Sequence, residues 1–200
     1  MKLRWLTLLP AVLLICGAAA ISLVIVLSRQ PGQPHIVSGK ALIGGPFTLT
    51  DHTGKRVSEK DFEGKFTLVY FGYTFCPDIC PAELQVMSAA LDQLGGKAKN
   101  VTPLFITVDP ERDGVKLLAG YVSNFHERLV GLTGNAKDIR AAAKAYRVYY
   151  ARVKDESSSA DYMMDHSSAV YLMGPKGKYL AHFAYGSGVD KMAEGIAKFL

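Results

Sequence analysis

Two cysteines, Cys76 and Cys80, lie close together in a short segment that also contains two prolines. Cysteine thiolates act as nucleophiles in disulfide exchange and as soft ligands for metal ions, so such a pair indicates redox or metal chemistry. Because Pro81 disfavours a helical conformation for the residue before it, we expect Cys80 at the cap of a helix that begins at Pro81. A helix N-terminus favours negative charge, so the Cys80 thiolate is expected to form easily. Both thiols are expected on one exposed turn.

The segment before the cysteines, 66–71, is apolar and rich in Tyr and Phe, which predicts a buried strand that leads into the cysteine turn. Apolar residues at helical spacing predict a helix over 81–94. The other expected elements are a β-hairpin over 47–57, strands over 101–108, 129–132 and 148–153, helices over 115–125, 136–146 (with Asn135 as its N-cap) and 189–200, and a second hairpin formed by 169–173 and 179–185. This order is typical of an α/β domain with a thioredoxin-like fold and an N-terminal β-hairpin.

In a thioredoxin-like fold, the segment that enters the penultimate hairpin approaches the cysteines, and here that segment is 162–168. Oxidoreductases of this fold carry a cis-proline there, whereas this chain has no proline in the segment and has His166 instead. Two thiolates and one imidazole suit Cu(I), while a structural zinc ion would normally take a fourth protein ligand. The pattern therefore predicts a metal site formed by Cys76, Cys80 and His166.

The N-terminal residues 5–27 form an almost unbroken apolar run. As a helix it would extend roughly 35 Å, which is enough to cross a hydrocarbon core about 30 Å thick. Lys2 and Arg4 precede the run and only Arg29 follows it closely, so residues 1–4 are expected in the cytoplasm and the folded domain outside. We expect a single transmembrane helix over 5–27.

Residues 28–40, rich in Gly and Pro, are expected to form a linker to the folded domain, 41–200. A cleaved signal peptide ending at Ala18–Ala20 is the alternative, but the apolar run continues beyond that point. Cys16 is expected to be a buried membrane residue, because bulky Ile15 disfavours cleavage of a lipoprotein before it. The four residues before the run leave no room for a mitochondrial transit peptide, which favours a bacterial source.

The composition fits one globular domain with a membrane segment, since 49% of 200 residues are hydrophobic. The formal charge of +5 comes without a basic cluster interleaved with aromatic residues, so nothing indicates binding to nucleic acid. Only two of the three cysteines lie in the folded part, which excludes a disulfide framework.

The sequence resembles the Sco/SenC family of copper-binding, thioredoxin-fold proteins from about Gly39 to the C-terminus. The resemblance rests on three motifs, FGYTFCPDICPAEL at 71–84, VDPERD at 108–113 and DHS at 165–167. It implies that Cys76, Cys80 and His166 bind one copper ion per chain, as Cu(I), Cu(II) or both. It also implies a role in assembling the dinuclear copper centre (CuA) in subunit II of cytochrome c oxidase.

These observations predict a copper chaperone anchored in a bacterial cytoplasmic membrane, with its domain on the periplasmic side. A periplasmic copper donor and a thiol reductase are expected as further partners, because an extracytoplasmic cysteine pair tends to oxidise to a disulfide. The alternative is a thiol-disulfide oxidoreductase or redox sensor, with Cys76 or Cys80 as nucleophile and His166 tuning the thiolate. A peroxiredoxin is disfavoured, since Val69 and Tyr73 occupy positions where its motif requires Pro and Thr.

Several nearby residues leave their roles open. Met163 and Met164 could assist Cu(I) through their thioethers, although packing is the favoured role. Asp78 fits either a turn or a tuning role, and the segment 109–113 either ends a strand with Asp113 capping a helix or contributes to the site. The other histidines lack a second ligand at useful spacing and are expected to be non-ligands: His35, His52, His126 and His182.

Overall fold

The computed structural model describes residues 42–154 and 161–200. The described residues belong to one compact unit, Ala41–Leu200. In the described residues, no helix combines the length and apolar character needed to cross a membrane. The predicted N-terminus, transmembrane helix and linker, 1–40, lie outside the described residues.

One mixed sheet of seven strands forms the centre of the domain, in the order β2-β1-β5-β4-β3-β8-β9. Its strands are β1 (Thr48–Asp51), β2 (Arg56–Ser58), β3 (Phe66–Gly72), β4 (Val101–Thr107), β5 (Val130–Thr133), β8 (Val170–Met173) and β9 (Tyr179–Phe183). β3 runs parallel to β4 and antiparallel to β8, so both of its edges are paired. The N-terminal hairpin is confirmed as β1 and β2, which pair antiparallel and lead through a short 3₁₀ helix, η1 (Glu59–Phe62), into β3.

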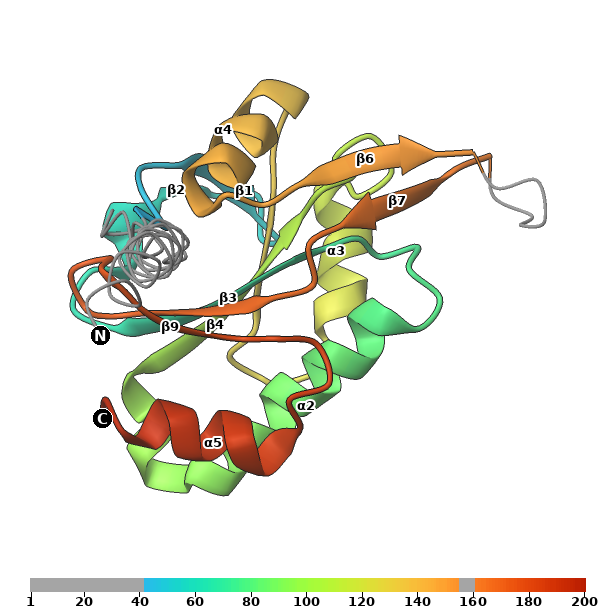
Figure 1. Ribbon diagram of the computed structural model, residues 1–200. Helices are drawn as coiled ribbons and strands as arrows, with labels where there is room; N and C mark the ends of the chain where they lie inside the picture. The colour runs from blue at the N-terminus through green and yellow to red at the C-terminus, as the bar shows by residue number, and fades with distance from the viewer. Residues whose placement is uncertain (1–41, 155–160) are drawn as a thin grey trace, which may run out of the picture. The chain divides into compact units, whose positions relative to one another are not determined.

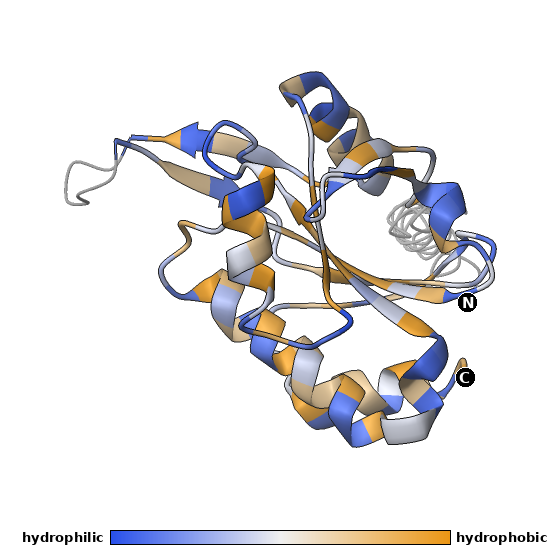
Figure 2. Cartoon of the chain, turned by 180° about the vertical axis from the view of Figure 1, so that it is seen from behind, coloured by the Kyte–Doolittle hydropathy of each residue, from blue (hydrophilic) through white to orange (hydrophobic). Residues whose placement is uncertain are grey.

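The helices cover both faces of this sheet (Figure 1). They are α2 (Ile79–Leu94), α3 (Val115–Val122), α4 (Ala136–Tyr146) and α5 (Val189–Ala197), with a 3₁₀ helix, η2 (Gly95–Asn100), after α2. α2 packs against α5 on one face, and α4 lies on the other. Hydrophobic residues dominate the central strands, whereas the helices alternate polar and apolar positions (Figure 2). The unit β3-α2-β4, followed after an insertion by β8-β9-α5, agrees with the predicted thioredoxin-like order.

Burial of β3 follows from its place in the middle of the sheet, because a strand with neighbours on both edges and helices on both faces must be apolar throughout. Tyr70 and Phe71 are fully buried, and they point to opposite faces because side chains alternate along a strand. The Phe71 ring meets Tyr146 of α4, while the Tyr70 ring lies near Phe105 of β4. Tyr70 points to the face of β3 that the cysteine segment covers, because a Cβ at Gly72 would contact both Tyr70 and Cys80.

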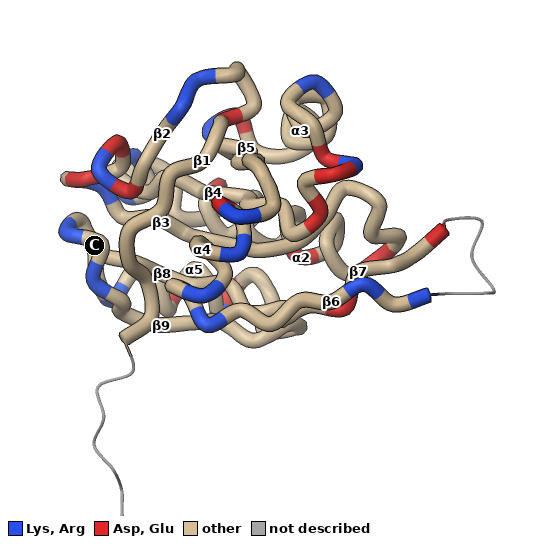
Figure 3. Tube along the Cα trace, turned by 90° about the horizontal axis from the view of Figure 1, so that it is seen from above, with Lys and Arg blue, Asp and Glu red and all other residues tan. Residues whose placement is uncertain are grey.

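A second, two-stranded sheet consists of β6 (Tyr150–Val153) and β7 (Met163–His166). The strands pair antiparallel, with His166 opposite Tyr150, and Figure 3 shows them side by side, apart from the main sheet. The sequence predicted β6 within 148–153 but did not predict β7. The candidate ligand His166 is thus the last residue of β7, the second strand of this small sheet.

Candidate metal centre

Cys76 is the half-buried thiol of the pair, and its environment favours the thiolate. Its Sγ accepts a hydrogen bond from the backbone N–H of Cys80, at 3.3 Å. The pKa of Cys76 is lowered by hydrogen bonds from the Cys80 side chain, from His166 and from the backbone N–H groups of Cys80 and Asp78. These amides belong to the start of α2, where N–H groups have no partner within the helix. Asp78 is the N-cap residue, but its side chain makes no capping bond.

Cys80 differs from the prediction in position, burial and ionisation. It is the second residue of α2, which begins at Ile79, and Pro81 is the third. Proline is tolerated there because the first N–H groups of a helix have no partner within it. The Cys80 side chain is fully buried rather than on an exposed turn. The hydrogen bond to the Cys76 sulfur, burial and the charge of Cys76 together raise the pKa of Cys80. The predicted acidic thiolate therefore belongs to Cys76, and Cys80 is its proton-bearing neighbour.

Close packing of Cys80 against β3 depends on Gly72. A Cβ atom at residue 72 would lie 2.9 Å from the Cys80 Sγ and 2.8 Å from Cε2 of Phe105. No real side chain fits at such distances, so the absence of a Cβ leaves the space in which the sulfur sits. Glycine is required at this position for close approach rather than for a special backbone conformation, because its φ is not positive.

His166, at the end of β7, turns its ring toward the cysteines. Its Nε2 lies 3.4 Å from the Cys80 Sγ, and its Nδ1 lies 3.0 Å from the Ser167 carbonyl oxygen. A carbonyl oxygen can only accept, so Nδ1 donates to Ser167, and Nε2 is the nitrogen that faces the sulfur. The rings of Tyr70 and Tyr73 meet His166 edge to face, with centroids 6.2 and 5.9 Å away. The three predicted ligands are thus brought together.

This donor set consists of two sulfur atoms and one imidazole nitrogen, and it fits a soft metal ion. Within the described ranges, no three His, Cys, Asp or Glu side chains are placed so that they could hold a metal ion together. A groove of about 610 Å³ opens beside the site, and its walls include Cys76, Ile79, Met163 and His166. An incoming ligand can therefore reach the site from one side.

The methionines before His166 occupy different environments. Met164 is buried in the core, as the packing interpretation predicts, and Met163 is half-buried; both contribute to the wall of the groove. The described histidines outside the site have other contacts. His52 accepts a hydrogen bond from the Gly131 N–H, His126 lies 3.7 Å from Asp92, and His182 is bonded to the Tyr179 hydroxyl; His35 lies outside the described residues.

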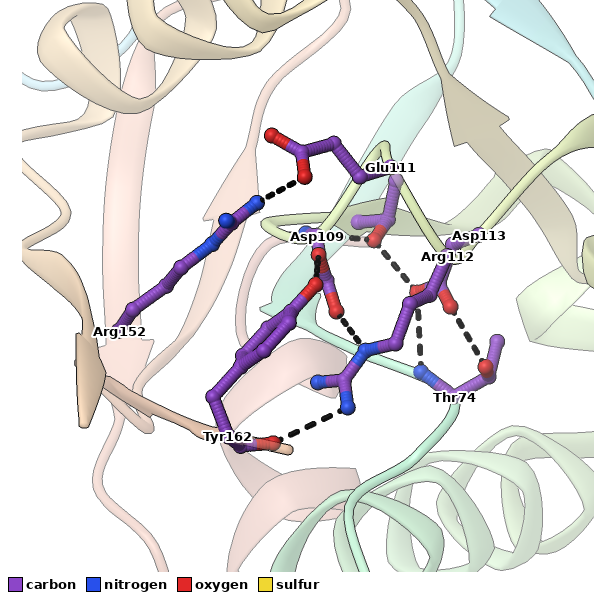
Figure 4. A network of polar contacts seen from close by, with 8 residues as sticks. Thr74, Asp109, Glu111, Arg112, Asp113, Arg152 and Tyr162 are labelled. Carbon is purple, nitrogen blue, oxygen red and sulfur yellow. Dashed lines mark hydrogen bonds and ion pairs between the residues drawn. The ribbon is translucent and has the colours of Figure 1, made fainter. Parts of the chain in front are cut away.

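The 109–113 segment contacts the site through a polar network that sequence reasoning missed (Figure 4). Asp113 does not cap α3, whose N-cap is Gly114; it accepts hydrogen bonds from Thr74 and Thr107 instead. Of the two alternatives left open for this segment, capping by Asp113 is therefore wrong, because its carboxylate reaches across to the cysteine loop. Asp109 is buried and bonded to Arg112. Its place directly after a buried strand could have indicated this pairing, because a buried carboxylate needs a partner.

A thioredoxin-like domain with a dithiol and an imidazole at one strand-to-helix junction defines a class of redox or metal-handling proteins. A sequence model described as SCO1/SenC matches residues 37–200. The chain belongs to the SCO1/SenC family.

Known proteins agree with this assignment. The chain is 46% identical over 168 residues to the human mitochondrial SCO1 homolog, covering 82% of this chain and 54% of that protein. It spans about half the length of the first curated relatives that it matches. The copper-bound structure of Arabidopsis thaliana ScoI is 46% identical, with a TM-score of 0.74 over 78% of this chain and 96% of that one. The copper-bound Bradyrhizobium japonicum ScoI is 40% identical, with a TM-score of 0.72 over 79% and 99%. These likenesses confirm the thioredoxin-like Sco fold.

Proposed function

We propose that this protein binds copper through Cys76, Cys80 and His166 and assists assembly of the CuA centre of cytochrome c oxidase subunit II. The family consists of copper-binding proteins involved in cytochrome c oxidase assembly. The observation that carries the proposal is the 3.4 Å approach of His166 Nε2 to the Cys80 sulfur, beside a second sulfur held on the Cys80 N–H.

The chain's own groups prepare this site for a soft cation. Cys76 supplies a thiolate, stabilised by backbone N–H groups, and His166 supplies a neutral nitrogen fixed by its bond to Ser167. Cys80 loses its proton when the cation arrives, because metal ligation favours the thiolate. Copper is the cargo in this scheme, and it leaves by ligand exchange as a partner thiol entering the groove replaces one ligand at a time.

We place the protein in a bacterial cytoplasmic membrane, with the domain on the periplasmic side. The support is the apolar run 5–27 and the charges of Lys2 and Arg4 before it. A periplasmic copper donor and a thiol reductase complete the proposal, since an oxidised pair could not bind copper.

A copper titration of the reduced full chain in mild detergent tests the proposal. We expect one Cu(I) per chain in anaerobic titrations, and thiolate-to-copper charge-transfer absorption with Cu(II). The variants Cys76→Ala, Cys80→Ala and His166→Ala should each lose more than the roughly 10–100-fold in affinity that loss of an outer-shell partner costs. His182→Ala is the matched control, because this histidine is bonded to Tyr179. Copper affinity unchanged in His166→Ala would refute the ligand assignment.

The second candidate function is thiol-disulfide exchange, favoured by the low pKa and partial exposure of Cys76. Reduction of a protein disulfide by the same full-length variants separates the two functions. If the dithiol reduces the disulfide while copper binds no better than to a double variant with both Cys76→Ala and Cys80→Ala, the oxidoreductase function replaces the chaperone function.

A further inference from the structure

The segment before Cys76 is anchored to the 109–113 loop. The Asp113 carboxylate accepts hydrogen bonds from the Thr74 backbone N–H at 3.0 Å and from the Thr74 hydroxyl at 2.6 Å. It also accepts one from the Thr107 hydroxyl, at 2.6 Å, and it is fully buried. Thr74 lies two residues before Cys76, so the position of the loop fixes where the cysteine segment starts.

Arg112 of the same loop binds the start of the hairpin strand that carries His166. Its Nε donates to the Asp109 carboxylate, and its Nη1 donates to the Tyr162 carbonyl oxygen at 3.0 Å. The Tyr162 hydroxyl donates to the other Asp109 oxygen, at 2.9 Å, and closes the network. The Arg112 guanidinium lies 3.9 Å from the Tyr162 ring centroid, within cation–π range.

Arg112 also contacts the cysteine side of the site. Its guanidinium lies 4.9 Å from the Phe75 ring centroid and 5.8 Å from that of Tyr73. Phe75 immediately precedes Cys76, and Tyr162 immediately precedes the strand that ends at His166. One side chain therefore contacts both segments that carry the candidate ligands, and Figure 4 shows its bonds to Asp109 and Tyr162.

We propose that Arg112 is a positioning residue that sets the distance between His166 and the two thiols. The inference rests on the proposed function, because it assigns Arg112 a role in that same copper site. A planar guanidinium suits the task, since it donates in two directions while stacking on aromatic rings, and a lysine ammonium cannot reproduce this geometry. Arg112 acts through Tyr162 and Phe75 and touches none of the ligands in the contacts described.

Arg152 provides a matched control on the same ring. Its guanidinium lies 4.4 Å from the Tyr162 centroid, and it forms an ion pair with Glu111 at 2.5 Å. Both partners of that pair are substantially exposed, so the pair adds little to the energetics of the fold. Unlike Arg112, Arg152 has no described bond to Asp109 or to the Tyr162 backbone.

A double-mutant cycle on the reduced full chain tests the proposal, with Cu(I) affinity measured by competition with a chelator. Arg112→Gln should lower the affinity roughly 10–100-fold, as expected for an outer-shell partner. Arg112→Lys should not restore it, and Arg152→Gln should change it less than about threefold. In the His166→Ala background, Arg112→Gln should cause no further loss, because the distance between the imidazole and the thiols no longer affects binding.

Equal losses in the two backgrounds, or no loss beside a normal His166, would overturn the proposal. If Arg112→Gln fails to unfold cooperatively on heating, Arg112→Lys replaces it, because lysine keeps the positive charge but cannot form both bonds of the guanidinium. Its loss of affinity should likewise disappear without His166, and an additive loss or no loss would also overturn the proposal.

A metal-free measurement separates this inference from the proposed function. The His166 ring resonances of the apo chain should shift in Arg112→Gln and stay in place in Arg152→Gln. If the wild-type chain binds no copper, the proposed function fails whatever the resonances do. Unmoved His166 resonances in Arg112→Gln overturn the positioning role whether or not copper binds.

Discussion

Replacing Gly72 with Ala should push the Cys80 sulfur out of its place. The new Cβ would lie 2.8 Å from Cε2 of Phe105, whereas carbon atoms in contact are normally about 3.5–4.0 Å apart. The backbone cannot easily retreat, because Gly72 pairs with Thr107 of β4 and its carbonyl accepts the Val108 N–H at 2.8 Å. Phe105 is fully buried, so its ring has little room either. Overpacking of this kind costs about 1–3 kcal/mol.

Gly120→Ala in α3 isolates that cost, since a Cβ there meets nothing within 4 Å. Both substitutions restrict the unfolded chain equally, and Gly120→Ala should stabilise the protein by about 0.5–1 kcal/mol. In urea unfolding, the free energy of unfolding of Gly72→Ala should therefore be about 1–3 kcal/mol lower than that of Gly120→Ala. Copper affinity should fall in Gly72→Ala alone. Equal stability of the two variants would show that Cys80 does not need the space above Gly72.

Two further predictions concern ionisation. Burial raises the pKa of Glu83, partly offset by a hydrogen bond from the Gly186 N–H, and one carboxylate oxygen has no hydrogen-bond partner in the described residues. A raised folded-state pKa lowers stability as pH rises above the ordinary glutamate value, so Glu83→Gln should raise Tm at pH 8 and lose that gain near pH 4; the same gain at both pH values contradicts this. Iodoacetamide at pH 6 should modify Cys76 before buried Cys80, and mass spectrometry showing the reverse order would refute the ionisation order.

Local patterns were enough to predict most of the elements. The apolar run at 66–71 is buried strand β3, and the periodic segment 136–146 is helix α4 with the same bounds. Asn135 caps that helix through a bond from the Asp138 N–H, at 2.9 Å. Predictions of this kind depend on residues close in the sequence, which is why they succeed.

The environments of the site residues could not be read in the same way. Cys80 is buried because the missing Cβ of Gly72 leaves space for its sulfur. The Asp113 carboxylate accepts a hydrogen bond from Thr74, 39 residues earlier. β7 is a strand because it pairs with β6, although Met163–His166 has no alternating pattern of its own. Each of these outcomes depends on tertiary neighbours, which override local preference.

The three candidate ligands come from two different sheets, the seven-stranded main sheet and the two-stranded sheet. Cys76 and Cys80 belong to the β3–α2 junction, which continues directly from a strand paired on both edges. His166 ends a separate two-stranded sheet, joined to the cysteine side by the Arg112 network and by the Tyr73 hydroxyl, which is bonded to the Met164 backbone. Displacing His166 from a metal would therefore leave the main sheet intact, whereas displacing Cys80 would require opening the core. Under the proposed function, the imidazole and the half-buried Cys76 exchange with a partner first, and Cys80 releases the copper last.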